Sequence, residues 1–437
     1  MIFTRLIPFA ALLLAALPAK AVDIQEVTTP GGITYWLVEE PSIPIVSLEI
    51  SFMGGARLNP EGKEGLANML TALLDEGAGD LDSVAFANTR DDLSARFGFG
   101  SGRDAVTVSA QMLVETMEPA AALLASALTA PRFDAPAVER VRAQILSGLA
   151  EDETDPQAIA GKAWSAAAFP GHPYGRPESG TTDSVSSLTA EDLRTALPSL
   201  INRANATVAI VGAVSPAQAS ALIDTVLEGV AEGTGFDRPW RKVAPPPGVE
   251  IIDFDVPQST AIFGHAGLKR TDPDFIPAFV MNYILGGGSF NSRLTDEVRE
   301  KRGLAYSVYA YMSVRDEAGL YLGSVQTSNE GMAESIEVIR AEWAKMAETG
   351  LTQDDLDKAK KYLTGAFPLR FDSNAKIASY LVFMQEEDLG IDYLDERNAL
   401  IEAVTLEAAN AAASRVLDPD ALSITIVGRP EGLTATR

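Results

Sequence analysis

The same pattern of residues occurs twice along this chain, at a constant spacing. Residues 206–212 and 422–428 form two similar apolar runs, Ala-Thr-Val-Ala-Ile-Val-Gly and Leu-Ser-Ile-Thr-Ile-Val-Gly, whose last residues lie 216 positions apart. Each run follows a helical pattern, at 190–200 and at 406–416. A repeat of this length predicts two domains of about two hundred residues with the same fold.

The order of elements within each half indicates the fold class. The halves open with extended segments, at 43–52 and 249–263, and a helical pattern follows each of them. Strands and helices do not alternate strictly, which favours an α+β fold over a doubly wound sheet. We therefore expect two homologous domains, each an antiparallel β-sheet layered with α-helices, arranged as a clamshell. The proline-rich stretch at 243–248 indicates a linker, and the predicted boundaries are 22–235 for the first domain, 236–248 for the linker and 249–437 for the second domain.

The first residues have the features of an export signal. Arg5 supplies a positive charge, residues 6–17 are apolar, and Ala19-Lys-Ala21 matches a cleavage site, so residues 1–21 are predicted to be a signal peptide cleaved near Ala21. An uncleaved anchor is less favoured because the apolar run is short and ends at Pro18. No later stretch is long and apolar enough to span a membrane, so we expect an exported protein, periplasmic or secreted, without a stable membrane anchor.

Composition limits the partners and the source of stability. The net charge is −25, which disfavours nucleic acid and anionic membranes as partners. The chain has no cysteine, so stability after export has to come from core packing and not from disulfides. Since hydrophobic residues make up 46% of the sequence, a chain of this length can build such a core.

A helical segment at 64–77 has the frame of a zinc-binding helix without its ligands. Five apolar residues recur at helical spacing and predict a core-facing side: Leu66, Met69, Leu70, Leu73 and Leu74. On the opposite side, Asn68, Thr71 and Ala72 occupy the functional positions of the inverted zinc motif His-x-x-Glu-His. These side chains cannot replace two imidazoles and a catalytic carboxylate.

The two histidines of the chain offer no obvious replacement. Catalytic zinc takes three protein ligands that are rich in histidine or cysteine, and the pair of histidines usually sits one helical turn apart. His172 lies in a turn-rich loop, where a hydrogen-bonded structural role is expected, and His265 lies in a strand-like run, where local packing is expected. We therefore predict no metal site in this chain.

Together these features resemble the pitrilysin/insulinase family of zinc metallopeptidases, in its class with two homologous domains per chain. The resemblance also rests on the sequence His-Pro-Tyr-Gly at 172–175 and on the long run at 285–306, Leu-Gly-Gly-Gly-Ser-Phe-Asn-Ser-Arg-Leu-Thr-Asp-Glu-Val-Arg-Glu-Lys-Arg-Gly-Leu-Ala-Tyr. It implies that the remaining metal ligand, a glutamate in the family, is replaced by Gly148. All four family positions have then been lost together, which fits a specialised subunit without a cofactor of its own.

The resemblance also implies a second set of site residues, in the C-terminal half. The family's arginine and tyrosine, seven residues apart, match Arg299 and Tyr306. We expect Arg299 in the last turn of a helix at 291–301 and Tyr306 at the start of a strand, so that both side chains can converge. The run Gly286, Gly287 and Gly288 predicts either a helix stop or a flexible loop that lets a peptide backbone approach.

These expectations define a function hypothesis and its alternatives. The chain is predicted to be a catalytically incomplete subunit whose homologous partner carries the zinc. It would grip a peptide or unfolded polypeptide substrate and stabilise the tetrahedral intermediate at the partner's metal. The alternatives are a peptide-binding protein that cleaves nothing and a purely structural partner whose arginine and tyrosine are relics. Autonomous catalysis lacks support, because the sequence has no nucleophile elbow, cysteine nucleophile or phosphate loop.

Overall fold

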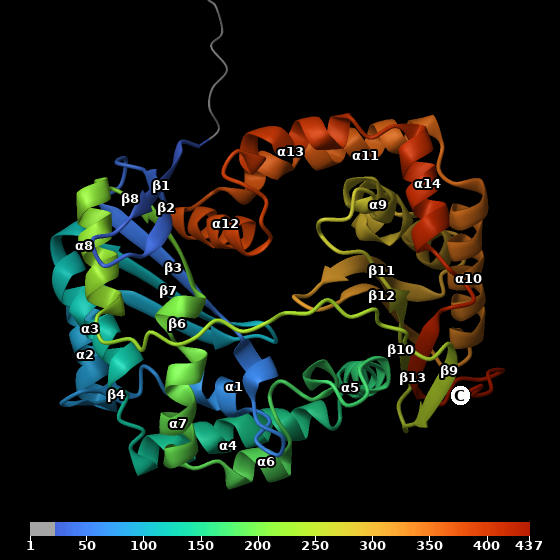
Figure 1. Cartoon of the computed structure of the whole chain (residues 1–437). Coiled ribbons are helices and arrows are strands. Elements are labelled where there is room, and N and C mark those ends of the chain that lie inside the picture. Colours follow the sequence, from blue (N-terminus) through green and yellow to red (C-terminus); the bar gives the residue numbers. More distant parts are fainter. Residues whose placement is uncertain (1–21) are drawn as a thin grey trace, which may run out of the picture.

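The first half of the chain folds around a six-stranded sheet. The structure is a computed structural model that describes residues 22–437 (Figure 1). The strand order of this sheet is β1-β2-β8-β3-β7-β6. Its strands are β1 (Ile24–Thr28), β2 (Thr34–Glu39), β3 (Ile45–Met53), β6 (Arg96–Ser101), β7 (Ala105–Leu113) and β8 (Ala206–Gly212).

The second half repeats this arrangement. Its five-stranded sheet has the order β11-β12-β10-β13-β9. Its strands are β9 (Gly248–Asp253), β10 (Gln258–Ala266), β11 (Ala305–Val314), β12 (Gly319–Ser328) and β13 (Ser423–Gly428). The two repeated apolar runs form β8 and β13, which take equivalent central places in the two sheets. The predicted α+β fold with two homologous domains is therefore confirmed.

The sheets differ from the prediction in one respect. Most neighbouring strands are antiparallel, but β2 runs parallel to β8 and β9 runs parallel to β13. In each half these two strands are an early and the last strand of the domain, and the chain between them includes several helices. A connection of that length can return the chain to the same end of the sheet, as a parallel pair requires.

Helices cover the two sheets. In the first half they are α1 (Leu66–Thr71), α2 (Ser83–Asp92), α3 (Met117–Thr129), α4 (Ala135–Asp152), α5 (Pro156–Ala168), α6 (Thr182–Ser187), α7 (Ala190–Leu200) and α8 (Pro216–Leu227), beside a small hairpin of β4 (Gly77–Ala78) and β5 (Leu81–Asp82). In the second half they are α9 (Phe275–Asn282), α10 (Met332–Thr349), α11 (Gln353–Gly365), α12 (Asn374–Glu386), α13 (Tyr393–Glu402) and α14 (Leu406–Val416). Each domain has its own apolar core between its sheet and its helices.

Each domain also lends one helix to the sheet of the other. Helix α5 packs on β10 and β13, whereas α12 packs on β3 and β8 (Figure 1). The indole N–H of Trp164 in α5 donates to the carbonyl of Ser423 at 3.0 Å, and the amide of Gln385 in α12 donates to the carbonyl of Val208 at 3.1 Å. Two further apolar clusters, one around each exchanged helix, join the domains. The clamshell is therefore closed by a reciprocal exchange of helices.

Two local predictions need correction, and the connecting segment can be described in more detail. The helix expected at 64–77 ends at Thr71, because the chain turns through the next residues and enters β4 at Gly77. The extended segment at 249–263 consists of two strands, with a break before Gln258. The connecting segment has no helix or strand between residues 230 and 247, but it is packed, since Val243 is buried against Trp164 and its neighbours.

The predicted signal peptide, residues 1–21, lies outside the described residues. From residue 22 onward, no helix combines the length and the apolar character that a membrane span requires.

Candidate functional site

Helix α1 holds the positions at which a zinc helix would carry its ligands. The helix starts after Gly65, whose φ of 88° suits glycine, and a side chain there would come within 2.6 Å of the Ser179 carbonyl oxygen. The predicted apolar side is confirmed, as all five of its residues belong to the core of the first domain. Asn59 adds a capping contact, because its side-chain oxygen accepts from the backbone N–H of Ala67 at 3.0 Å.

The three replaced positions do not share one open face, which corrects the prediction. Asn68 is half-buried and Ala72, at the helix end, is exposed. Thr71 instead is only 3% exposed, and its hydroxyl donates to the carbonyls of Ala67 at 3.1 Å and Asn68 at 3.0 Å. A threonine can turn inward in this way because its short hydroxyl reaches the preceding helical turn.

The fourth replaced position, Gly148, lies on the exposed side of α4, and a side chain there would meet open space. Within residues 22–437 no group of three or more histidine, aspartate or glutamate side chains lies close enough to hold a metal ion. The four positions therefore supply one amide, one inward-facing hydroxyl, one methyl group and a bare backbone. That set of groups does not fit zinc.

A cavity of about 690 Å³ remains beside Asn68. Its walls come from α5, the end of β6 and the loop around Gly175 and Pro177. The charged groups that line it have ion-pair partners: Arg103 contacts Glu178 at 2.7 Å, Lys162 contacts Asp152 at 3.0 Å, and Arg176 contacts Glu64 at 3.3 Å. The cavity beside α1 therefore offers charged groups that are already engaged in ion pairs.

Arg299 and Tyr306 converge as predicted. Arg299 lies in η7 (Thr295–Glu300), a π-helical segment, and its guanidinium carbon lies 4.8 Å from the centre of the Tyr306 ring. Tyr306 is the second residue of β11, and the pairing with β12 shifts register between Ala305 and Ser307. Tyr306 is therefore the extra residue of a β-bulge, and such bulges re-aim side chains near functional sites. Its side chain is 82% exposed.

Phe290 is a third member of this cluster that the sequence analysis did not identify. Its ring centre also lies 4.8 Å from the Arg299 guanidinium, so the cation is held between two aromatic rings. The side chain is largely exposed although it is a phenylalanine. The only signal in the sequence was its place between the glycine run and Arg299. Within residues 22–437, the guanidinium has one ion-pair contact, 3.4 Å between Arg299 Nε and Glu300, so its other N–H groups can still bind an anion.

The three glycines before Phe290 are closely packed against the protein. Gly286 and Gly287 are the last residues of η5 (Tyr283–Gly287), a second π-helical segment that continues α9, and Gly288 follows it. A side chain at Gly286 would come within 2.7 Å of Ala310 on β11, and one at Gly288 would come within 2.7 Å of the Tyr283 carbonyl oxygen. Glycine is required here for close packing within the domain. A role of these glycines in binding a peptide stays a prediction.

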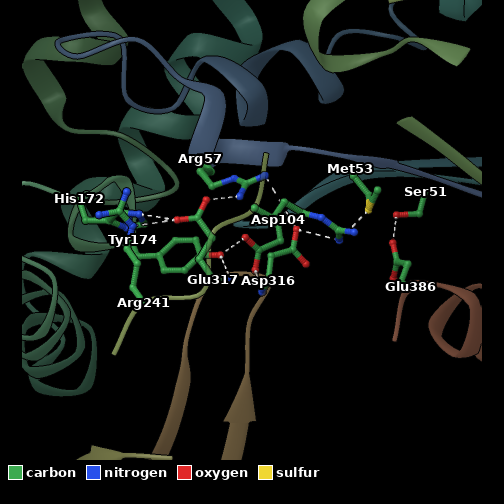
Figure 2. Close-up of polar contacts among 11 residues, drawn as sticks. Ser51, Met53, Arg57, Asp104, His172, Tyr174, Arg241, Asp316, Glu317 and Glu386 are labelled. Carbon is green, nitrogen blue, oxygen red and sulfur yellow. Dashed lines mark hydrogen bonds and ion pairs between the residues drawn. The ribbon is translucent and has the colours of Figure 1, made fainter. Parts of the chain in front are cut away.

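A buried polar cluster connects the two domains at the tip of the β11–β12 hairpin (Figure 2). Glu317 is 6% exposed and accepts from Arg57 at 2.5 Å, from His172 Nε2 at 2.9 Å and from Arg241 of the connecting segment at 3.3 Å. Burial alone would raise the pKa of Glu317, but the hydrogen bond from His172 and the charge of Arg57 bring this pKa below its ordinary value. One carboxylate thus joins both domains and the segment between them.

Tyr174 and His172 explain why the sequence His-Pro-Tyr-Gly matters to the fold. The Tyr174 hydroxyl donates to Asp104 at 2.5 Å and accepts from the backbone N–H of Glu317 at 3.3 Å. His172 Nδ1 accepts from the backbone N–H of Tyr174, which leaves Nε2 to donate to Glu317. The predicted structural role of His172 is confirmed, and its partner lies in the other domain.

His265 is also structural. It is buried, Nδ1 lies 2.8 Å from the carbonyl oxygen of Ala266, and Nε2 accepts from the indole of Trp343 at 3.0 Å. Burial lowers the pKa of His265, so the ring is neutral at physiological pH. Both ring nitrogens are engaged, which leaves none for a metal.

A second polar contact between the domains is acidic. Glu49 and Ser51 lie on the face of β3 that α12 covers, and the Ser51 hydroxyl donates to Glu386 of α12 (Figure 2). Burial, together with the charge of Glu386, raises the pKa of Glu49 to about 7. Burial raises the pKa of Glu386 as well. The contact between α12 and the first sheet therefore contains two carboxyl groups that resist ionisation.

Comparison with known proteins places the chain in a family. A family model described as insulinase (peptidase family M16) matches residues 35–182, and one described as peptidase M16 inactive domain matches residues 187–363. The chain belongs to the peptidase M16 family. With the zinc positions replaced, it is a member of the inactive type.

Individual relatives agree with membership of the peptidase M16 family. The chain is 26% identical to the non-peptidase homolog YmxG of Helicobacter pylori, over 84% of both chains. It is also 26% identical to an uncharacterized zinc protease of Streptomyces coelicolor, over 95% of this chain and 91% of the relative. A crystal structure described as peptidase M16 inactive domain from Pseudomonas fluorescens superposes with a TM-score of 0.88 at 28% identity, over 95% of this chain and 99% of that one.

Proposed function

We propose that this protein is the arginine–tyrosine subunit of an exported, heteromeric M16 zinc peptidase. The observation that carries the proposal is the pair of Arg299 and Tyr306, in which a guanidinium side chain that is 27% exposed lies against the ring of a tyrosine that is 82% exposed. The guanidinium is stacked between two rings, and the phenol projects from a β-bulge into solvent. Folding alone does not require an arrangement that buries so little apolar surface.

The pair has a defined chemical use beside a metal site. A positively charged guanidinium can bind a substrate carbonyl or carboxylate through charge-assisted hydrogen bonds. The phenol can donate to the oxyanion that forms when water attacks a peptide carbonyl. The missing parts are zinc, its ligands and the general base, and a homologous partner would supply all of them. This chain would add substrate binding and transition-state stabilisation.

A second candidate function is peptide binding without cleavage. The cavity beside Asn68 favours it, because a space of about 690 Å³ persists where the ligands have been lost. In this case the chain would work alone or as a homodimer, and its ligand would be a peptide that is bound but not cleaved.

Co-purification from the native host distinguishes these functions. The proposal predicts a partner with an intact His-x-x-Glu-His motif, about one zinc per complex, and peptide hydrolysis by the complex. The chain alone should contain no stoichiometric zinc and cleave nothing. Tightly bound zinc in the isolated chain would refute the proposal, and recovery of the chain with peptides but no homologue would favour the binding protein.

A further inference from the structure

The second domain has an apolar groove that the proposed site does not yet use. Its volume is about 740 Å³, and it lies between η5 and α11. The rings of Tyr283 and Tyr362 stack in its wall, with their centres 5.1 Å apart and their planes 24° apart. The other apolar groups that line it are Ile284, Ala359, Ala366 and Leu369.

Large side chains at this groove are left exposed. Tyr362 is 54% exposed and Leu369 is 77% exposed. Single exposed apolar residues are common on protein surfaces, but a concave site with a stacked aromatic pair is typical of a ligand pocket. The groove is therefore suited to an apolar group that is not part of this chain.

One short loop connects the groove with the arginine–tyrosine pair. Asn291 lines the groove and directly follows Phe290, whose ring holds Arg299. On the same short loop, Gly288 lies so close to Tyr283 that a side chain there would come within 3.3 Å of the phenol ring. The loop at residues 288–291 thus supplies Asn291 to the groove wall and Phe290 to the Arg299 guanidinium.

The charges at the rim indicate the chemistry of the occupant. Asp355 is already engaged by Arg293 at 3.1 Å and by the backbone N–H of Thr352 at 3.0 Å. Lys358 pairs with Asp354 at 2.6 Å, and a second cation, Lys361, also lines the groove. Since the carboxylate that lines the groove is already bonded, the groove favours an aromatic or aliphatic side chain over a lysine or arginine.

We propose that this groove binds a bulky apolar side chain of the peptide that Arg299 and Tyr306 hold, and that it sets the substrate preference of the subunit. The inference rests on the proposed function, since it assigns a specificity pocket to the same site. The volume accommodates one aromatic side chain together with the backbone that carries it.

The test measures peptide binding to the isolated full chain by fluorescence anisotropy. The probes are two fluorescein-labelled dodecapeptides of glycine, serine and alanine, which are identical except that one has a central phenylalanine where the other has serine. The native chain should bind the phenylalanine peptide at least about tenfold more tightly. The double variant Tyr362→Ala/Leu369→Ala should reduce this preference to less than about threefold, because both substituted side chains are exposed and contribute little to folding.

The matched control is Leu400→Ala, which removes another partly exposed leucine, on α13, and should keep the full preference. Equal binding of the two peptides by the native chain, no detectable binding of either, or an unchanged preference in the double variant would each overturn the inference. Loss of partner binding by the double variant would assign the groove to the subunit interface and would overturn it too.

Failure of the proposed function gives a different result. If Tyr306→Phe leaves hydrolysis by the reconstituted complex unchanged while the phenylalanine preference still depends on Tyr362, the groove is a binding site and the catalytic role of the pair is wrong. If hydrolysis depends on Tyr306 but the peptides bind equally, the function stands and the groove inference is wrong.

Discussion

The two domains share a topology, but their candidate site residues are placed in opposite ways. In the first domain, Thr71 turns into its own helix and bonds two backbone carbonyls. In the second domain, Tyr306 projects into solvent, and Arg299, which is 27% exposed, lies against the rings of Tyr306 and Phe290. Thr71, which has no catalytic group, is thus buried in its own domain, whereas the hydroxyl-bearing ring of Tyr306 remains accessible to a substrate. A helix with the sequence frame of a zinc helix can thus be packed into a domain without metal-binding side chains.

The largest effect is expected for a variant of the arginine–tyrosine pair. In the reconstituted complex, Tyr306→Phe removes one hydroxyl and keeps the ring on which Arg299 stacks. If the phenol stabilises the oxyanion, kcat should fall by about 100- to 1,000-fold, and binding of the partner should not change. Steady-state hydrolysis of a model peptide measures this. Normal turnover would make the pair a relic and favour the structural-partner alternative.

Arg299→Ala extends this test to substrate binding. The guanidinium would act before the transition state as well as in it, so KM should rise while kcat falls. Phe290→Ala should reproduce a smaller part of this change, because it releases the guanidinium without removing its charge. A change of kcat alone in Arg299→Ala would contradict the binding role.

The next largest effect is expected on stability, from the buried Glu317 cluster that connects the two domains. Glu317→Ala would leave Arg57, which is buried, without its partner at 2.5 Å. Removal of one member of a buried ion pair costs about 3 kcal/mol or more, so the midpoint of chemical unfolding should fall markedly. The exposed pair of Lys358 and Asp354 is the control, and Asp354→Ala should cost less than about 1 kcal/mol. Equal costs would mean that the cluster contributes nothing special to the closed arrangement.

The inward-facing threonine predicts what happens when the zinc motif is restored. Thr71→Glu places a carboxylate where the side chain is only 3% exposed, and we expect a loss of about 2 kcal/mol in the free energy of unfolding. Asn68→His, at a half-buried position, and Ala72→His, at an exposed one, should each change stability less than Thr71→Glu. Urea unfolding of the three single variants measures whether Thr71→Glu lowers the free energy of unfolding the most. If Thr71→Glu is tolerated as well as the other two, this face of α1 is more open than the structure indicates.

Much of the architecture was predictable because it depends on local pattern. The repeated apolar runs predicted two like domains, and helical spacing correctly assigned the core side of α1. The helix exchange was not predictable in this way, since an apolar face does not say which sheet it covers. Trp164 and Ala168 are four residues apart in α5, yet only the folded chain shows that they pack against the second domain. Phe290 was not predicted either, because its contact with Arg299 depends on the conformation of a loop and not on a local residue pattern.

The smallest expected effect concerns the acidic contact under α12 and depends on pH. The raised pKa of Glu49, about 7 instead of 4.5, means that the folded chain binds a proton that the unfolded chain releases. Stability should therefore fall as the pH rises from about 4.5 to 7, and the loss should be complete above pH 7. Glu49→Gln removes this titration, although Glu386, Asp316 and Glu387 with the nearby Arg238 still face the contact. The variant should match the native chain near pH 4 and exceed its stability by about 1–2 kcal/mol at pH 8. Glu61→Gln, at an exposed position, should show no such pH dependence. If Glu49→Gln is instead less stable at pH 8, Glu49 forms a favourable charged contact in the folded chain, and the proposed source of pH dependence is wrong.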